Sequence, residues 1–216
     1  MESAITVKGQ ATIPKPIREH LGLQPGDRVK FFVHPDGSVV LLPKRSASAI
    51  RGMVKSRSPR ARDHRANDRS SCRRCFESKS AATTPMIGLD TNVLILYLTQ
   101  DDPVQSAKAT AILERRLTPK NPGFVSVVAM VETVWVLDCA YGLTAQEIAT
   151  AVERLLQVEV LAIENEQEVF TAMVALKQGR GSFADALVAE LGARAGCTRT
   201  LTFDQKALRL PSFELV

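Results

Sequence analysis

The chain has 216 residues, of which 45% are hydrophobic, and it carries a formal net charge of +5 at pH 7. This length and apolar content exclude a chain that is disordered throughout, and they allow one ordinary domain together with a smaller one. The sequence contains no apolar run of about 18 residues and no signal-peptide pattern, so we expect a cytoplasmic protein with no membrane partner.

The charge is distributed unevenly along the chain. Lys and Arg outnumber Asp and Glu by seven to four in residues 1–45 and by ten to three in residues 46–85, whereas residues 86–216 hold eleven basic and sixteen acidic side chains. A basic N-terminal half indicates a polyanion partner. An acidic C-terminal part indicates that its carboxylates have a functional role, such as binding a divalent cation.

Residues 1–45 are predicted to form a small β-rich domain. Two short strands flank a turn at 8–10, and two prolines then open a short helix that Gly22 ends. A hairpin follows, with strands over 29–34 and 38–42. Its apolar content is too large for a unit of this size to bury alone, so we expect an interleaved dimer.

This domain resembles the AbrB/SpoVT/MazE family of swapped-hairpin DNA-binding domains. The resemblance rests on the sequence VKGQATIPKPIR at 7–18, the Pro-Gly-Asp turn at 25–27 and the final hairpin. It implies operator DNA as a partner, with contacts from Lys8, Gln10, Thr12, Lys15 and Arg18. The chemistry agrees, because Lys and Arg neutralise phosphates while Gln and Thr reach base edges. The alternative is that these five are ordinary solvated side chains.

Residues 46–85 differ in kind from both neighbours. Residues 46–54 could begin a helix, but from residue 55 the sequence is rich in Arg and Ser and poor in aliphatic side chains, so we predict a basic disordered linker over 46–85. Cys72 and Cys75 have the spacing of half a zinc site, but no second pair follows. Two origins are open for 55–85: a reading-frame shift that joined two neighbouring genes, or a selected linker that holds nucleic acid.

Residues 86–216 alternate between strand and helix patterns, which predicts an α/β domain. A short apolar strand at 86–89 leads directly into a helix, and helical segments then separate the later strands. The predicted strands lie at 86–89, 124–125, 158–163, 199–202 and 213–216. We expect one mostly parallel sheet of five strands covered by helices on both faces.

Four carboxylates stand at informative places in this domain. Asp90 and Asp204 come just after predicted strands, and Asp185 lies in the first turn of a helix. Glu132 interrupts the apolar helix 127–137, which we expect to be buried, and a buried carboxylate takes up a proton or binds a cation. Each acid also has an ordinary explanation: a helix cap, a favourable helix dipole, or an exposed strip of helix.

Taken together, the four acids fit one cleft at the carboxyl edge of the sheet, where open α/β sheets bind their ligands. Gathered carboxylates repel one another unless a hard divalent ion such as Mg²⁺ or Mn²⁺ takes their oxygens as ligands. Such an ion activates water and neutralises a scissile phosphate. The arrangement therefore indicates phosphodiester hydrolysis.

Residues 86–216 resemble a PIN domain of the VapC toxin type. The matching pieces are the sequence GLDTN at 88–92, Glu132, the sequence FADA at 183–186, and the sequence TFD at 202–204. The resemblance implies a Mg²⁺- or Mn²⁺-dependent endoribonuclease. In such an enzyme Asp90, Glu132 and Asp185 are metal ligands, Asp204 binds a second ion or positions water, and Thr91 and Thr202 are supporting hydroxyl donors.

The pairing of the two domains resembles a VapBC toxin and antitoxin joined in one chain. It implies an RNA substrate, autoregulatory operator binding, a homodimer or higher homo-oligomer, and possibly a separate antitoxin, because 55–85 lacks the expected inhibitory tail. A second reading is an AbrB-type regulator whose PIN domain serves for oligomerisation or binding, with little nuclease activity. A DNA-repair or rRNA-processing nuclease fits the acids equally well but leaves the N-terminal domain unexplained.

Overall fold

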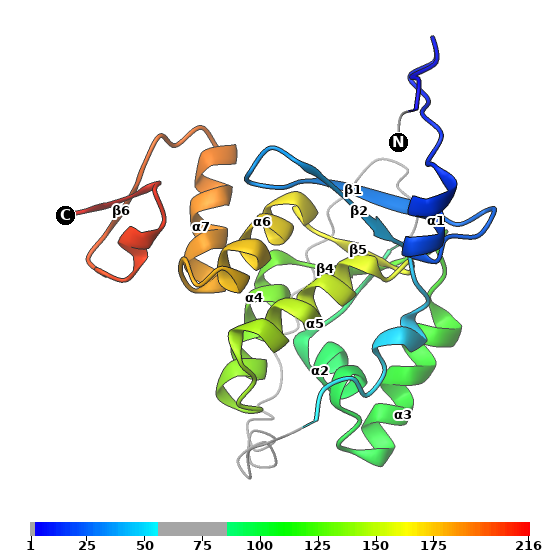
Figure 1. The fold of residues 1–216 in the computed structure, drawn as a ribbon. Coiled ribbons are helices and arrows are strands. Elements are labelled where there is room, and N and C mark those ends of the chain that lie inside the picture. The colour runs from blue at the N-terminus through cyan, green and yellow to red at the C-terminus, as the bar shows by residue number, and fades with distance from the viewer. Residues whose placement is uncertain (1–2, 56–85) are drawn as a thin grey trace, which may run out of the picture.

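A computed structural model describes residues 3–55 and 86–216 (Figure 1). The segment 56–85 lies outside the described residues, and with it most of the predicted linker, the pair Cys72 and Cys75, and both suggested origins of this segment. None of the helices in the described part is long and apolar enough to cross a membrane.

The short helix and the hairpin of the N-terminal domain form as its sequence predicts, whereas the two strands predicted around the turn at 8–10 are reduced to a single bridge. An arm over residues 3–12 turns back on itself through a bridge between Ile5 and Ala11. Helix α1 (Lys15–Leu21) starts at a proline and ends at Gly22, whose positive φ of 67° a residue without a Cβ adopts readily. Strands β1 (Val29–Val33) and β2 (Val39–Pro43) then pair as an antiparallel hairpin.

One face of this hairpin packs against helix α6 (Glu166–Lys177) of the C-terminal domain. Phe32 is 2% exposed and stacks on Phe170, with their ring centroids 4.7 Å apart. Lys30 Nζ lies 2.5 Å from Glu166 Oε2, and the Gln167 side chain donates to and accepts from the backbone of Val33. The small domain therefore buries apolar surface within its own chain.

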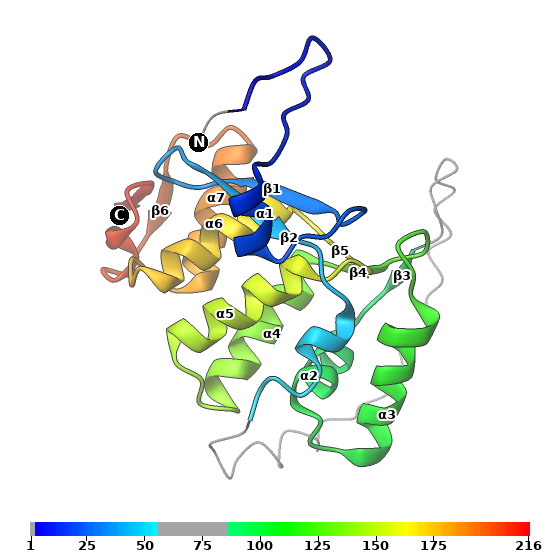
Figure 2. The same cartoon turned by 45° about the vertical axis from the view of Figure 1, so that its right-hand side comes forward.

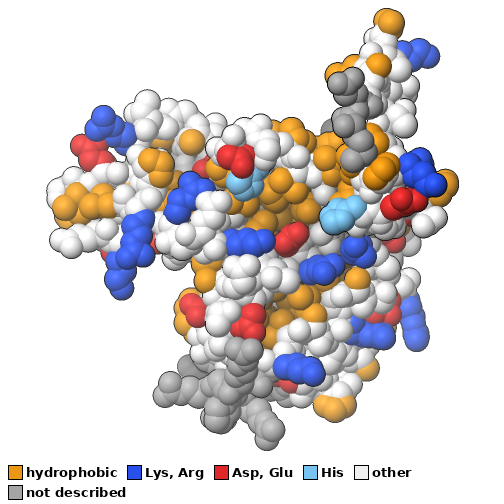
Figure 3. Space-filling view, viewed as in Figure 1, with side chains coloured by type: hydrophobic (Ala, Val, Ile, Leu, Met, Phe, Trp, Pro, Cys, Tyr) orange, Lys and Arg blue, Asp and Glu red, His pale blue; other side chains and the backbone are white. Residues whose placement is uncertain are grey.

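The opposite face of the hairpin stays open. Phe31 is 64% exposed, and Val33 and Val39 are each 57% exposed, because side chains alternate between the two faces of a strand. Figure 3 shows hydrophobic side chains on this side of the molecule, in the region where Figure 1 draws the hairpin. The interleaved dimer predicted for this domain remains a prediction, since a single chain cannot test it.

The segment 46–55 differs from the prediction of a linker that begins at residue 46. It forms a short 3-10 helix, η1 (Ala47–Ile50), and then runs along the C-terminal domain with Ile50 and Val54 buried. The Val54 N–H donates to the Leu98 carbonyl at 2.9 Å. Apolar anchors thus order this part of the chain, and the prediction of disorder is wrong for 46–55.

A three-stranded parallel sheet forms the centre of the C-terminal domain. Its strands are β3 (Ile87–Gly88), β4 (Gly123–Val125) and β5 (Leu161–Ile163), in the order β3-β4-β5. The helices around it are α2 (Thr91–Thr99), α3 (Pro103–Ala111), α4 (Val127–Cys139), α5 (Ala145–Gln157), α6 and α7 (Phe183–Arg194). A π-helical turn, η3 (Ile112–Arg116), follows α3. The α/β class is therefore as predicted.

The last two strands differ from the prediction of one five-stranded sheet. Strands β6 (Thr200–Thr202) and β7 (Phe213–Leu215) form a separate two-stranded parallel sheet. The short 3-10 helix η4 (Ala207–Arg209) lies between them. Figures 1 and 2 show this pair beyond α7, and Figure 2 shows β3 on the opposite side of the molecule. Strand patterns predicted the strands themselves but not their neighbours, because pairing depends on contacts distant in sequence.

Candidate active site

Asp90 lies where strand β3 gives way to helix α2. It occupies the position before the first helical residue, with extended backbone angles, and its side chain is exposed. The Asn92 side chain donates to Asp90 Oδ2 at 3.2 Å, while the Asp90 side chain makes no capping hydrogen bond to the helix backbone. The carboxylate at this strand end is therefore not used to cap the helix.

Glu132 reaches the same corner from helix α4. Thr91 Oγ1 donates a hydrogen bond of 2.7 Å to Glu132 Oε2, and Thr91 itself is 3% exposed. Because Thr91 follows Asp90 directly, this contact holds the Glu132 carboxylate near the end of β3. Thr91 is a hydrogen-bond donor here, and its role as a supporting hydroxyl in a catalytic site stays a prediction.

The burial predicted for Glu132 is wrong. The residue is exposed, and it shares the outer side of α4 with Val128, which is 75% exposed, and Trp135, which is 54% exposed. Only Ala129, Met130, Thr133, Val134 and Leu137 on this helix are buried. An apolar sequence allows a helix to be buried, but the elements that pack against the helix determine how much of its surface is covered.

Asp185 and Asp204 are both held by local hydrogen bonds. Ser182 caps α7, accepting from the Asp185 N–H at 3.0 Å and donating to Asp185 Oδ2 at 2.6 Å. Asp204 follows β6, where its N–H donates to Thr202 Oγ1 and its Oδ1 accepts from the Lys206 N–H. Asp185 is half-buried and Asp204 is exposed.

The four acids do not form one cleft within a single chain. Asp90 and Glu132 meet through Thr91, whereas Asp185 and Asp204 belong to α7 and to the loop after β6. In residues 3–55 and 86–216 there is no group of three or more His, Cys, Asp or Glu that could hold a metal ion. Carboxylate oxygens suit Mg²⁺ by their chemistry, but their placement in one chain does not fit a bound ion.

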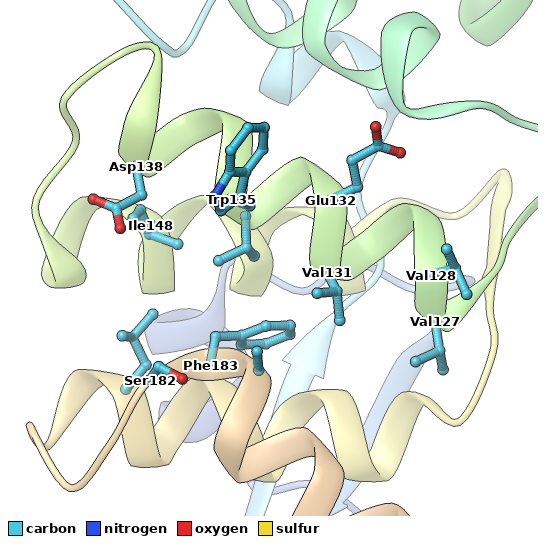
Figure 4. A pocket seen from close by; sticks show the side chains of 12 residues that line it. Val127, Val128, Val131, Glu132, Trp135, Asp138, Ile148, Ser182 and Phe183 are labelled. Carbon is cyan, nitrogen blue, oxygen red and sulfur yellow. The ribbon is translucent and has the colours of Figure 1, made fainter. Parts of the chain in front are cut away.

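An apolar hollow that the sequence did not predict lies between α4 and the start of α7. It has a volume of about 610 Å³, and Glu132 and Asp138 stand on its lining. Figure 4 shows Val131 and Phe183 facing each other across it, with the Glu132 carboxylate on the side of α4 away from Phe183. The apolar lining includes Val127, Val131, Trp135, Ile148, Leu176 and Phe183.

The five residues predicted to contact DNA are all exposed. Lys8, Gln10 and Thr12 lie on the arm, whose turn Gly9 makes with a φ of 73°, and Lys15 and Arg18 lie on α1. Lys15 also lies 3.6 Å from Glu19 on the same helix. Figure 2 shows the arm standing clear of the rest of the molecule.

A second basic group, which the sequence reading missed, lies where the hairpin meets the C-terminal domain. Burial, followed by the positive charges of Lys30 and Arg28, lowers the pKa of Lys44 below its ordinary value of 10.5. Lys44 and Arg28 line a hollow of about 240 Å³ that Glu159 also lines. No sequence signal identified this group, because its members come from separate strands and a loop.

Two families of domain match the chain. Residues 6–49 match the model for the antidote-toxin recognition domain MazE, a bacterial antitoxin, and residues 87–212 match the model for the PIN domain. This confirms the predicted arrangement of an antitoxin-like domain followed by a PIN domain, and it supports a fusion of the toxin–antitoxin kind.

Among curated proteins, the chain is similar to antitoxin PrlF of Escherichia coli strain K12 and to antitoxin PrlF of Escherichia coli O6:H1. Each is 46% identical over 41 residues, which is 18% of this chain and 37% of the relative. The chain thus spans little more than a third of the length of these relatives. Since the PIN model covers more than half of the residues, the chain belongs to the PIN domain family and carries a MazE-like antitoxin domain at its N-terminus.

Proposed function

We propose that the chain is a divalent-cation-dependent endoribonuclease of the VapC toxin type, joined to a DNA-binding antitoxin domain. The observation that carries this proposal is the hydrogen bond from Thr91 to Glu132 beside Asp90, at the carboxyl end of strand β3 in a PIN domain. PIN domains are usually nucleases, and this sheet edge is where α/β folds place their ligands.

The proposed reaction is hydrolysis of an RNA phosphodiester. Buried Thr91 fixes the orientation of Glu132, and Asn92 donates to Asp90, so that two carboxylates occupy defined places at one corner. We assign Mg²⁺ or Mn²⁺ as the cofactor, because hard divalent ions prefer carboxylate oxygens. The two acids that one chain brings together are too few to complete the set of ligands.

The N-terminal domain is proposed to bind operator DNA as a dimer and so to regulate its own transcription. Its arm and α1 present Lys8, Gln10, Thr12, Lys15 and Arg18 on an exposed surface. The open hairpin face with Phe31 and Val33 supplies apolar surface for a second copy. Phosphate contacts from Lys and Arg would supply affinity, and the Gln and Thr side chains would reach bases.

A second candidate is a DNA-binding regulator whose PIN domain binds or oligomerises without much cleavage. The separation of Asp185 and Asp204 from Asp90 and Glu132 in one chain favours it. The two candidates differ in whether the acidic residues of the PIN domain catalyse hydrolysis of RNA. An RNA cleavage assay with variants of these residues therefore distinguishes them.

The assay uses the full chain, total RNA and Mg²⁺. Asp90→Asn should lower cleavage by several orders of magnitude, because it removes a proposed metal ligand. The fold should stay intact, because the Asp90 side chain is exposed and takes no part in core packing. Asp138→Asn is the matched control, since Asp138 is an exposed acid at the end of α4. Equal cleavage by the parent and the Asp90→Asn variant would leave the regulator as the better function.

A further inference from the structure

Three cationic side chains share one face of the hairpin. Side chains alternate along a strand, so Arg28 and Lys30 lie on the same face as Phe32, which packs on α6. The Lys44 N–H donates to the Arg28 carbonyl at 2.9 Å, which continues the ladder of the hairpin and places these two residues opposite each other. Like charges directly opposite on paired strands repel. The face that meets the PIN domain therefore carries concentrated positive charge.

The hollow of about 240 Å³ lies where this face meets the PIN domain. Both domains contribute to its lining, which includes Arg28, Lys44, Pro119 and Glu159. Pro119 precedes β4 and Glu159 precedes β5, so the hollow lies at the amino ends of these strands, whereas Asp90 follows β3 at the carboxyl ends. Figure 3 shows Lys and Arg side chains gathered below the region where Figure 1 draws the hairpin. The hollow is thus separate from the candidate active site.

Two of the neighbouring acids already have partners. Glu166 Oε2 lies 2.5 Å from Lys30 Nζ, which pairs this carboxylate with the third cation of the face. Asp27 lines the hollow, and its Oδ2 accepts from the Gln24 N–H at 2.8 Å within the local turn. Glu159 remains as an exposed carboxylate on the lining.

Lys44 is a half-buried cation, and its ammonium group has no hydrogen bond or ion pair within residues 3–55 and 86–216. Burial lowers its pKa most, followed by the positive charges of Lys30 and Arg28. The negative charges of Glu166 and Glu159 oppose this shift but act less strongly on the ammonium group. The electrostatic potential at Lys44 is therefore positive in spite of these acids, a setting that favours an anion.

We propose that this hollow binds a tetrahedral oxyanion, with a phosphate group held between Arg28 and Lys44. A guanidinium can donate two parallel hydrogen bonds to phosphate oxygens, and an ammonium supplies a compact positive charge with three donors. The bound phosphate offsets the repulsion between the two opposite cations. Its binding therefore stabilises the hairpin in its place on the PIN domain.

A free phosphate ion and a phosphate of a nucleic acid share this chemistry. The proposal does not rest on cleavage of RNA or on operator binding, because the hollow contains neither Asp90 nor any of the five residues expected to contact DNA. Binding measurements therefore test it without any use of nuclease activity.

Titration of the full chain with inorganic phosphate, at constant ionic strength and in EDTA, tests the site. Calorimetry should give one phosphate per chain. Lys44→Met and Arg28→Met should each weaken binding roughly tenfold, because each removes a charge-assisted contact. Lys108→Met is the matched control, since Lys108 is exposed on α3. Equal affinity in the parent, Lys44→Met and Arg28→Met would place the phosphate elsewhere and overturn the proposal.

Thermal melts show whether the variants fold and whether phosphate stabilises the chain. Lys44→Met keeps an unbranched side chain and removes a charge that burial disfavours, so without phosphate it should melt no lower than the parent. Saturating phosphate should raise the melting temperature of the parent and of Lys108→Met, but not that of Lys44→Met. An equal rise in all three would overturn the proposal.

Glu159→Gln examines whether the acid on the lining already serves as the counterion. The substitution removes a negative charge from the hollow, so it should tighten phosphate binding several-fold. Phosphate binding by Glu159→Gln with none by the parent would show that Glu159 neutralises the cations itself, and this would overturn the proposal.

A short single-stranded oligodeoxynucleotide distinguishes the two sources of phosphate. Tighter binding of the oligonucleotide than of inorganic phosphate, weakened by Lys44→Met and not by Lys108→Met, would identify a nucleic acid as the ligand. Oligonucleotide binding that Lys44→Met leaves unchanged would identify free phosphate, provided that the phosphate titration gives the expected losses. Either result supports the site, whereas absence of binding by both ligands would overturn it.

Discussion

The hydrogen bond of 2.7 Å from Thr91 Oγ1 to Glu132 Oε2 joins helix α2 to helix α4 at the end of strand β3. Thr91 is buried, so its hydroxyl has a fixed position, whereas Glu132 is exposed and has many alternatives in water. The contact therefore orients the carboxylate more than it stabilises the fold, and this can be tested.

Thr91→Val keeps the shape of the side chain and removes the donor. We expect cleavage to fall by roughly ten- to a hundredfold and the free energy of unfolding to fall by about 1 kcal/mol, because one hydrogen bond is lost. Thr99→Val is the control on the same helix, since Thr99 Oγ1 donates to the Ile95 carbonyl instead. Cleavage kinetics and thermal unfolding measure the two effects. A similar loss of cleavage in both variants would remove Thr91 from the site.

Removing divalent ions should abolish RNA cleavage, and added Mg²⁺ or Mn²⁺ should restore it. The carboxylates cannot be brought together beside a phosphate without a cation to offset their charge. The measurement is cleavage of RNA in EDTA and after titration with each ion. Undiminished cleavage in EDTA would contradict the assigned cofactor.

Hairpin docking on α6 should depend on Phe32 and not on its neighbour Phe31. Phe32 is 2% exposed against Phe170, whereas Phe31 is 64% exposed on the opposite face. Phe32→Ala should cost about 3 kcal/mol of docking and speed amide hydrogen exchange in β1 and β2, because it removes a buried ring. Phe31→Ala removes no contact with α6, so at concentrations at which the chain is a monomer it should leave exchange in the hairpin unchanged. Equal exchange in the two variants would mean that the hairpin does not depend on this contact.

Protonation of the Glu190 carboxyl on α7 should make the free energy of unfolding depend on pH. Burial, followed by the negative charge of Glu168, raises the pKa of Glu190 above its ordinary value of 4.5. The folded chain therefore holds this proton more tightly than the unfolded chain does. Its contribution to stability is full below pH 4.5 and is lost as the pH rises through the raised pKa.

Glu190→Gln removes the ionisable group, so it should raise the melting temperature at pH 7 relative to the parent. The difference should shrink towards zero as the pH falls to about 4, where the parent carboxyl is protonated as well. Thermal melts of both chains between these pH values measure it. A variant less stable than the parent at pH 7 would show that the charged form is not disfavoured.

Operator binding by the N-terminal domain should be sensitive to salt. Lys15→Ala and Arg18→Ala should each weaken binding and lower the log-log salt slope by about 1, since each phosphate contact releases a counterion. The effect of Lys15 should be the smaller, because Glu19 already competes for its ammonium group at 3.6 Å. Lys108→Ala, at an exposed position of helix α3 in the PIN domain, should change neither quantity. The same affinity at low and high salt would indicate a protein partner instead.

Interactions between residues close in sequence allowed several features of this fold to be predicted. Gly22 ends α1 as predicted, and the strands of the predicted hairpin pair as β1 and β2. Asp90 and Asp204 each follow a strand, as expected. Such features depend on residues a few positions apart, and those interactions form whatever the rest of the chain does.

The segment 46–55 shows where composition misleads. Ala47, Ile50 and Val54 are 3%, 1% and 4% exposed against the PIN domain, although the Arg-rich sequence that follows them makes the composition of 46–85 strongly polar. Three anchors at suitable spacing are enough to order ten residues when a complementary surface is present. That surface comes from α5 and η3, which contact η1, and from the end of α2, which accepts the hydrogen bond of Val54, so only the folded chain reveals it.

The amino-acid sequence by itself determined the α/β class, the short helix and hairpin of the small domain, and which carboxylates follow a strand. The tertiary structure alone decided that Glu132 is exposed, that the hairpin rests on α6, and that, within the described residues, β6 pairs with β7 and not with β3. The division has a physical reason. Caps and turns are satisfied by neighbours in the chain, whereas coverage of a helix face and choice of a strand partner depend on surfaces that meet only after folding.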